Sequence, residues 1–210
     1  MCAMYVPEQF RITDDAVINE FITAHNFATI ITADADSTPI ASHLPLILHA
    51  KEAHERTLHG HVARANTHWK LFEQGRTTLV VFQGAHSYVS PRWYNHENVP
   101  TWNYLTVHAY CTPRIFTQRE ELLVNVEQLT EKYELPEEYS IHALSPRFLE
   151  KELRGIVGFE LAVERVEAAF KLSQNRDTES HASIMTHLEA SQNMNEQGIA
   201  AAMKLHSPHR

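Results

Sequence analysis

Residues 101–116, TWNYLTVHAYCTPRIF, form the longest strand-like run in the chain. At its start Trp102 and Tyr104 alternate with Asn103, so the two aromatic rings share one face of the predicted strand. A planar ligand can stack on such a face. The competing interpretation is that the rings seal the mouth of a barrel, and the motif alone favours that interpretation.

On both sides of this run, the chain contains strand-like and helical patterns. Strands are predicted at residues 27–32, 39–48, 57–63, 77–82, 86–91 and 157–163, where β-branched residues and alternating polarity predominate. Helical spacing is predicted at 16–22, 65–74, 120–133 and 146–155, with a polar, helix-prone tail at 178–205. We therefore expect a mainly β fold with flanking helices (α+β). Residues 1–210 would form a single domain, with a helical satellite at about 118–155 and a helical tail at about 177–210.

Composition limits the classes of function. Eighteen Lys and Arg residues stand against 26 Asp and Glu residues, a formal charge of −8. This charge repels a DNA backbone unless the cations gather on one face. The chain has no apolar run of about 20 residues and no secretory signal, so we expect a cytoplasmic protein that does not enter the membrane. Cys2 and Cys111 are expected to be free thiols.

Three more groups of residues are candidates for ligand binding. His61-Val62-Ala63-Arg64-Ala65-Asn66 ends a strand and begins a helix, where Arg64 and helix-start amides favour an anion. Lys171 to Arg176 combines cations, a hydroxyl and carboxamides that suit a phosphate or the polar edge of a flavin. Ser42-His43-Leu44-Pro45 places a proline inside a strand, which indicates an edge or a ligand-facing opening. The alternatives are a surface arginine with an Asn cap for the first group and a solvated loop for the second.

Several kinds of site find no support in the sequence. No GxGxxG or GxxxxGK[ST] motif is present, so a nucleotide would be held by side chains. His59 and His61 share a strand face, but no third His or Cys stands at a ligand spacing, so no metal site is predicted. No nucleophile pairing suggests a hydrolase, and catalytic residues are unassigned.

Taken together, these motifs resemble the PaiB family of FMN-binding negative transcriptional regulators. The similar segments are Met4-Tyr5-Val6-Pro7, Ser42 to Pro45, Gly60 to Asn66, Val81-Phe82-Gln83-Gly84, Tyr88 to Pro91, Val99 to Tyr104 and Lys171 to Arg176. Ala85 and Cys111 depart from the family pattern, which expects proline and glycine at these positions.

The resemblance implies an FMN-binding split β-barrel, related to the pyridoxamine-phosphate oxidase-like barrels, that binds FMN at a homodimer interface. Arg64 and its neighbours would bind the phosphate and Ser42 to Leu44 the ring edge, with Trp102 and Tyr104 as candidates for contacts from the second subunit. The cofactor-binding residues implied are Ser42, His43, Leu44, His61, Arg64, Ala65, Asn66, Ser90, Trp102, Asn103, Tyr104, Lys171, Ser173 and Gln174.

Three functions stay open at this point. The first is a regulator of the PaiB type, although no helix-turn-helix is evident and DNA would have to meet an unrecognised surface. The second is an FMN-dependent oxidoreductase that uses NAD(P)H, since this barrel often leaves room above the flavin. The third is a haem-binding split barrel, suggested by the 15 histidines.

Overall fold

The computed structural model describes residues 4–52, 55–135 and 137–206. Its strands form one sheet in the order β3-β2-β6-β7-β8-β5-β4, and β1 (Arg11–Ile12) pairs with β8 (Ile156–Lys171). The other strands are β2 (Phe27–Ala33), β3 (Pro39–Pro45), β4 (Ile47–Glu52), β5 (Glu55–Ala63), β6 (Thr78–Val89) and β7 (Thr101–Phe116). The pairs β1–β8, β2–β3, β2–β6, β4–β5 and β5–β8 are antiparallel.

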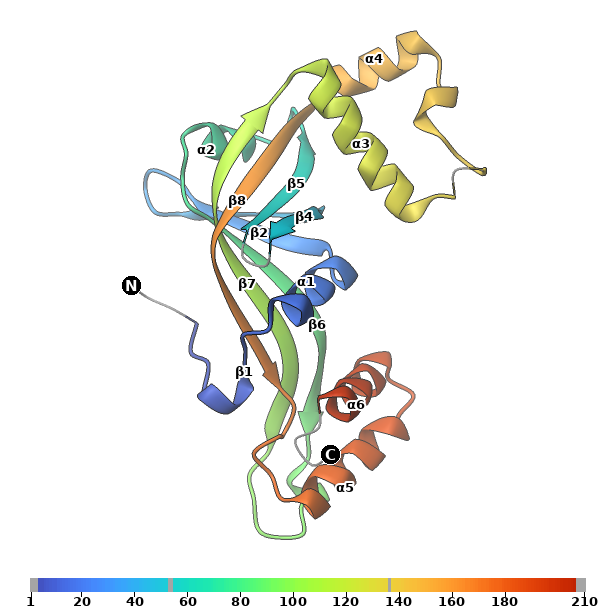
Figure 1. Cartoon of the computed structure of the whole chain (residues 1–210). Helices are drawn as coiled ribbons and strands as arrows, with labels where there is room; N and C mark the ends of the chain where they lie inside the picture. Colours follow the sequence, from blue (N-terminus) through green and yellow to red (C-terminus); the bar gives the residue numbers. More distant parts are fainter. Residues whose placement is uncertain (1–3, 53–54, 136, 207–210) are drawn as a thin grey trace. The chain divides into compact units, whose positions relative to one another are not determined.

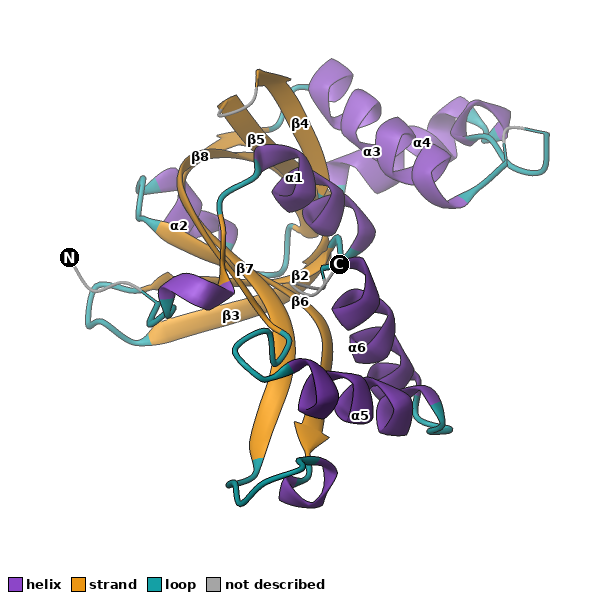
Figure 2. Cartoon of the chain, turned by 60° about the horizontal axis from the view of Figure 1, so that its bottom comes forward, coloured by secondary structure: helices purple, strands orange, loops and turns teal. Residues whose placement is uncertain are grey.

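Helices flank this sheet, as the orange strands and purple helices of Figure 2 show. They are α1 (Asp15–Ala24), α2 (Trp69–Glu73), α3 (Arg119–Tyr133), α4 (Pro146–Arg154), α5 (Thr178–Glu189) and α6 (Met194–Leu205). Short 3-10 turns lie at Glu8–Phe10, Pro91–Trp93 and Ile141–Ala143. The predicted mainly β fold with flanking helices is confirmed. Within the described residues, no helix is long and apolar enough to cross a membrane.

The chain divides into two compact units. Unit 1 comprises Met1–Ile18, Gln83–Val107 and Glu167–Arg210; unit 2 comprises Asn19–Phe82 and His108–Val166. In unit 2 the rings of Phe72 and Phe159 pack 5.1 Å apart, and both side chains are fully buried. In unit 1 α5 and α6 lie side by side (Figure 1) and bury Ile184, Leu188 and Met203.

Some predicted boundaries are wrong, each for a local reason. The single strand expected at 39–48 breaks at Leu46, because Asn26 holds that residue through both backbone groups: Leu46 N donates to Asn26 O at 2.9 Å, and Asn26 Nδ2 donates to Leu46 O at 3.1 Å. The helix expected at 65–74 begins only at Trp69, since residues 64–68 form turns. Gly75 follows it with a φ of 66°, as expected for a glycine that ends a helix.

Two strands are longer than expected. The segments expected at 77–82 and 86–91 are one strand, β6, and β8 continues past residue 163 to Lys171. Of the two predicted free thiols, Cys111 is buried and free, and burial raises its pKa to about 12. Cys2 and residues 207–210 of the predicted helical tail lie outside the described residues.

Gly158 on β8 marks the closest packing in unit 2. A Cβ atom at this position would lie 2.1 Å from Cε2 of Phe116. Phe116 in turn packs with Leu122 of α3 and Leu153 of α4. Glycine at 158 therefore lets the sheet accept the ring on which these two helices rest.

We predict that Gly158→Ala destabilises the chain by about 2 kcal/mol, because the added methyl overpacks a filled site. Phe116→Leu should cost about 1 kcal/mol alone, and the double variant should be more stable than the sum of the two losses by roughly 1 kcal/mol. Urea unfolding of the three variants measures these values. Strict additivity would contradict the proposed clash.

Candidate functional site

The predicted cofactor residues divide between the two units. Unit 2 holds Ser42, His43, Leu44, His61, Arg64, Ala65 and Asn66; unit 1 holds Ser90, Trp102, Asn103, Tyr104, Lys171, Ser173 and Gln174. Each group is built from strand ends and the turns that follow them.

Ser42, Asn66 and His68 form a polar network in unit 2. Asn66 Nδ2 donates to Ser42 Oγ at 3.2 Å, and Asn66 Oδ1 accepts from the backbone N–H of His68 at 3.0 Å. Ser42 Oγ lies 2.9 Å from His68 Nδ1. Ser42 and His68 are 8% and 1% exposed. The sequence analysis missed His68, although an Asn side chain that bonds the N–H two residues on is a recognised turn motif.

The buried surroundings of His68 favour an uncharged imidazole ring. Burial lowers its pKa from the ordinary value of 6.5. Its ring lies 4.7 Å from that of Phe72, and within the described part of the chain its buried Nε2 has no hydrogen-bond partner. An ionised imidazole would need a partner for each nitrogen, so burial favours the uncharged ring.

Arg64 has a structural role that the sequence did not indicate. Its Nε donates to Arg154 O and its Nη2 to Ile156 O, both at 2.9 Å. Its backbone N–H donates to Gly155 O at 2.7 Å. The side chain thus ties the end of β5 to the end of α4. Among the described residues Nη1 makes no hydrogen bond, so it is available to an anion.

The remaining unit 2 residues are less constrained. His43 is exposed, and its Nδ1 lies 3.1 Å from Thr29 Oγ1. His61 Nδ1 lies 2.8 Å from Asn125 Oδ1 on α3. Leu44 is half-buried and Ala65 exposed. Among the described residues, no three His, Cys, Asp or Glu side chains could together hold a metal ion.

In unit 1 the two faces of β7 differ in their exposure to solvent, as the alternation in the sequence predicts. Asn103 is fully buried, whereas Trp102 is 54% exposed and Tyr104 is half-buried. The Trp102 ring lies 6.1 Å from Tyr88, edge-on, and 6.2 Å from His86. Tyr88 is itself 43% exposed. These rings form an aromatic surface and do not seal a core.

The end of β8 is fastened to the start of β7 by two side-chain bonds. Lys171 Nζ donates to Thr101 Oγ1 at 2.6 Å, and Ser173 Oγ donates to Asn103 Oδ1 at 3.0 Å. Burial, and then the nearby Arg176, lower the pKa of Lys171. Ser173 has a φ of 61°, a left-handed conformation that is uncommon for serine. These bonds therefore connect the two segments of unit 1 that carry its candidate ligand-binding residues.

Two of the predicted cofactor-binding residues stabilise local turns. Ser90 Oγ accepts from the backbone N–H of Arg92 at 3.3 Å and caps the turn that follows β6. Gln174 Oε1 accepts from Leu172 N at 2.7 Å, and its Nε2 donates to Phe170 O at 2.6 Å. With both ends of its carboxamide engaged, Gln174 shapes the turn after β8 and has little left to offer a ligand.

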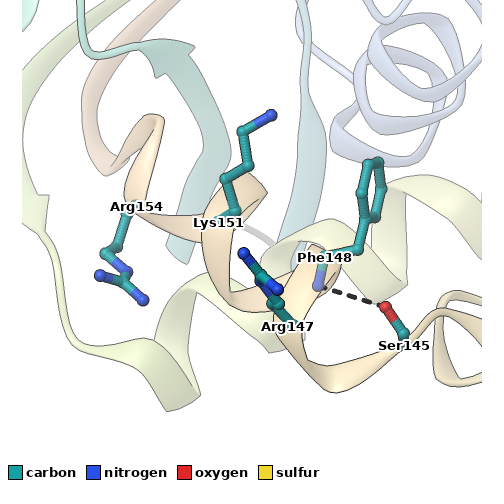
Figure 3. A pocket seen from close by; sticks show the side chains of 5 residues that line it. All are labelled: Ser145, Arg147, Phe148, Lys151 and Arg154. Atoms are coloured by element: carbon teal, nitrogen blue, oxygen red, sulfur yellow. Dashed lines mark hydrogen bonds between the residues drawn. The ribbon is translucent and has the colours of Figure 1, made fainter.

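A cavity of about 470 Å³ lies on α4, lined by Ser145, Arg147, Phe148, Lys151 and Arg154. Figure 3 shows these side chains projecting from the helix, with Ser145 Oγ accepting from the backbone N–H of Phe148. Arg154 pairs with Glu150 at 3.4 Å and Lys151 with Glu152 at 3.7 Å. Because its cations are exposed and largely paired, the cavity has the character of a solvated helix face.

Each group, taken by itself, offers side chains that suit one part of FMN. The Ser42 hydroxyl and Nη1 of Arg64 suit oxygen acceptors, Trp102 and Tyr104 present flat apolar rings, and Lys171 adds a positive charge. Bound FMN would supply an isoalloxazine ring able to accept and return electrons. The polar and charged side chains among these residues would orient the cofactor and neutralise its phosphate.

The buried His68 predicts a loss of stability in mild acid. Because its pKa is lowered in the folded chain, the unfolded chain binds the proton more tightly, so stability falls as the pH drops below 6.5. Urea unfolding at about pH 7.5 and about pH 5.5 should show a larger loss for the wild type than for His68→Asn, which cannot titrate there. Parallel losses would show that His68 is not the group concerned.

Sequence comparison assigns the chain to a family. The model of the family described as "Putative FMN-binding domain" matches residues 4–165. The chain is 39% identical over 203 residues to "Protease synthase and sporulation protein PAI 2" of Bacillus subtilis (strain 168), covering 96% of this chain and 97% of that protein.

Solved structures agree on the fold. The conserved hypothetical protein Rv2991 from Mycobacterium tuberculosis superposes with a TM-score of 0.60 at 12% identity, over 83% of this chain and 94% of that chain. The FAD and heme binding protein from Mycobacterium smegmatis gives 0.59 at 13% identity, over 82% and 78%. The predicted split-barrel fold class and the FMN cofactor are confirmed. The chain belongs to the PaiB family of FMN-binding split-barrel proteins.

Proposed function

We propose that this chain is a homodimeric regulator of the PaiB type that binds FMN at the subunit interface and responds to the flavin or to a small ligand beside it. The observation that carries the proposal is the family match over residues 4–165 together with near full-length similarity to a relative named for sporulation and protease synthesis. The cytoplasm is the compartment we propose for it.

The exposed aromatic surface of unit 1 supports the dimer. Trp102 and Tyr88 expose 54% and 43% of their surface, and Val99, close by in the chain, exposes 68%. Large apolar side chains grouped in this way are typical of interfaces and ligand grooves, because their exposure to water is unfavourable. A second subunit and a flavin ring would together cover them.

The unit 2 residues would hold the polar parts of FMN. In this proposal Nη1 of Arg64 contacts the phosphate, and the strand from Ser42 to Leu44 faces the polar edge of the ring. Lys171 would add a second cation near the cofactor, where burial already lowers its pKa. Within unit 1, Asn103 and Ser173 would support the neighbouring ligand candidates, since both are buried and bonded to each other.

We predict saturable binding of one FMN per subunit by a chain that has the mass of a dimer in solution. Absorption spectra before and after FMN addition and desalting, with light scattering for the mass, test both. Retained flavin bands on a dimer support the proposal, whereas a colourless monomer rejects it. Steady NAD(P)H oxidation at ordinary enzyme rates would replace the regulatory role with that of an oxidoreductase.

A second prediction concerns Trp102. Trp102→Ala should change the free energy of unfolding by less than about 0.5 kcal/mol, because the ring is half exposed. It should weaken FMN binding roughly tenfold through lost stacking. Phe148→Ala on α4 is the matched control, an equally exposed aromatic that we place outside the site. Equal FMN affinity in the two variants would remove Trp102 from the site.

A further inference from the structure

The direction of the Ser42 hydroxyl can be deduced from the hydrogen bonds around it. Asn66 Oδ1 accepts from the backbone N–H of His68, which fixes the orientation of the Asn66 amide. Its other end, Nδ2, therefore faces Ser42 Oγ and can only donate. Ser42 thus accepts at least one hydrogen bond.

The second neighbour of Ser42 is His68 Nδ1, 2.9 Å from Oγ. A neutral imidazole carries its proton on one nitrogen. If Nε2 carried it, an N–H would be buried beside the Phe72 ring without an acceptor among the described residues. Unpaired buried N–H donors are rarer in proteins than under-satisfied acceptors. The proton therefore belongs on Nδ1, from which it is donated to Ser42 Oγ.

With two bonds accepted, the one remaining proton of Ser42 has no acceptor among the described residues that contact it. We propose that His68 and Asn66 hold Ser42 as a fixed hydroxyl donor, and that this donor recognises a carbonyl oxygen of the flavin ring. His68 is then a positioning residue that acts through Ser42. The ligand part of this inference rests on the proposed function.

The position of the proton on His68 can be measured without a cofactor. The ¹⁵N chemical shifts of the imidazole nitrogens distinguish an N–H nitrogen from a bare one. In the flavin-free protein near neutral pH, we expect Nδ1 of His68 to be protonated and Nε2 to be bare. A protonated Nε2 would overturn the inference, because Ser42 would then donate to His68.

Flavin affinity tests whether His68 acts through Ser42. Ser42→Ala should weaken FMN binding about fivefold to tenfold, and His68→Leu about threefold. In the Ser42→Ala background, His68→Leu should have no further effect on affinity. An equal effect of His68→Leu in both backgrounds would show that His68 only fills space, and the proposal would fail.

His68→Asn is the matched control for His68→Leu. The two side chains are similar in size, but only Asn can place an amide nitrogen where Nδ1 of His68 lies. We expect His68→Asn to keep near wild-type FMN affinity. If it binds as weakly as His68→Leu while both variants unfold at wild-type urea concentrations, the hydrogen bond to Ser42 is not what matters.

Riboflavin identifies the acceptor, because it has the flavin ring without the phosphate. The loss caused by Ser42→Ala should be the same for riboflavin and FMN. A loss seen with FMN alone would place the donor on the phosphate and overturn the assignment to a ring carbonyl. A wild-type protein that binds no flavin would reject the proposed function, while the ¹⁵N measurement would still decide the His68–Ser42 arrangement.

Discussion

The strict alternation of β7, the middle strand in the sheet order, is the constraint on which the rest of the structure depends. Between β6 and β8, both edges of β7 are hydrogen-bonded, so its side chains can only point to one face or the other. Every second residue from Asn103 to Pro113 is buried. A shift of one residue would bury Trp102 and expose Asn103. The exposure of the aromatic surface and the burial of the Asn103 contact to Ser173 are thus two consequences of one register.

Many hydrogen-bonding groups of the candidate site residues are already bonded to other parts of the protein. Arg64 ties β5 to α4, Gln174 shapes the turn after β8, and Ser90 caps the turn after β6. A side chain that is already held in place loses little freedom when a ligand arrives, so these internal bonds make the candidate ligands preorganised. They also mean that Arg64 would offer a phosphate only the N–H groups of Nη1 and Nη2 that these bonds leave over, and Ser42 would offer a single proton to an acceptor.

The strongly negative chain leaves many of its cations paired. Arg114 contacts both Glu160 and Glu121, and Arg119 shares Glu150 with Arg154. Pairs of this kind at the surface contribute little to stability, but they cancel the positive charge that a nucleic-acid backbone would seek. The regulatory role that we propose therefore rests on the binding of flavin or a small ligand and does not require a large basic surface.

The sequence by itself determined the period of each strand, the helices with clear caps, and the family. Residues 101–116 form a strand with the predicted faces, and the helix predicted at 146–155 is α4, which Ser145 caps. These features are local, because a strand's alternation and a helix cap depend on residues only a few positions apart. Motifs in a specific order were enough to identify FMN as the cofactor.

Only the tertiary structure decided which side chains meet. The break at Leu46 depends on Asn26, 20 residues away, and the pairing of His68 with Ser42 spans 26. The local pattern places Phe72 one helical turn after His68. It does not show that Ser42 of β3 lies against the other side of the ring. Likewise, the sequence predicted Arg64 as a phosphate-binding residue but not its bond to the end of α4, a contact made across 90 residues. Distant contacts of this kind arise when the chain closes on itself, and no short-range pattern encodes them.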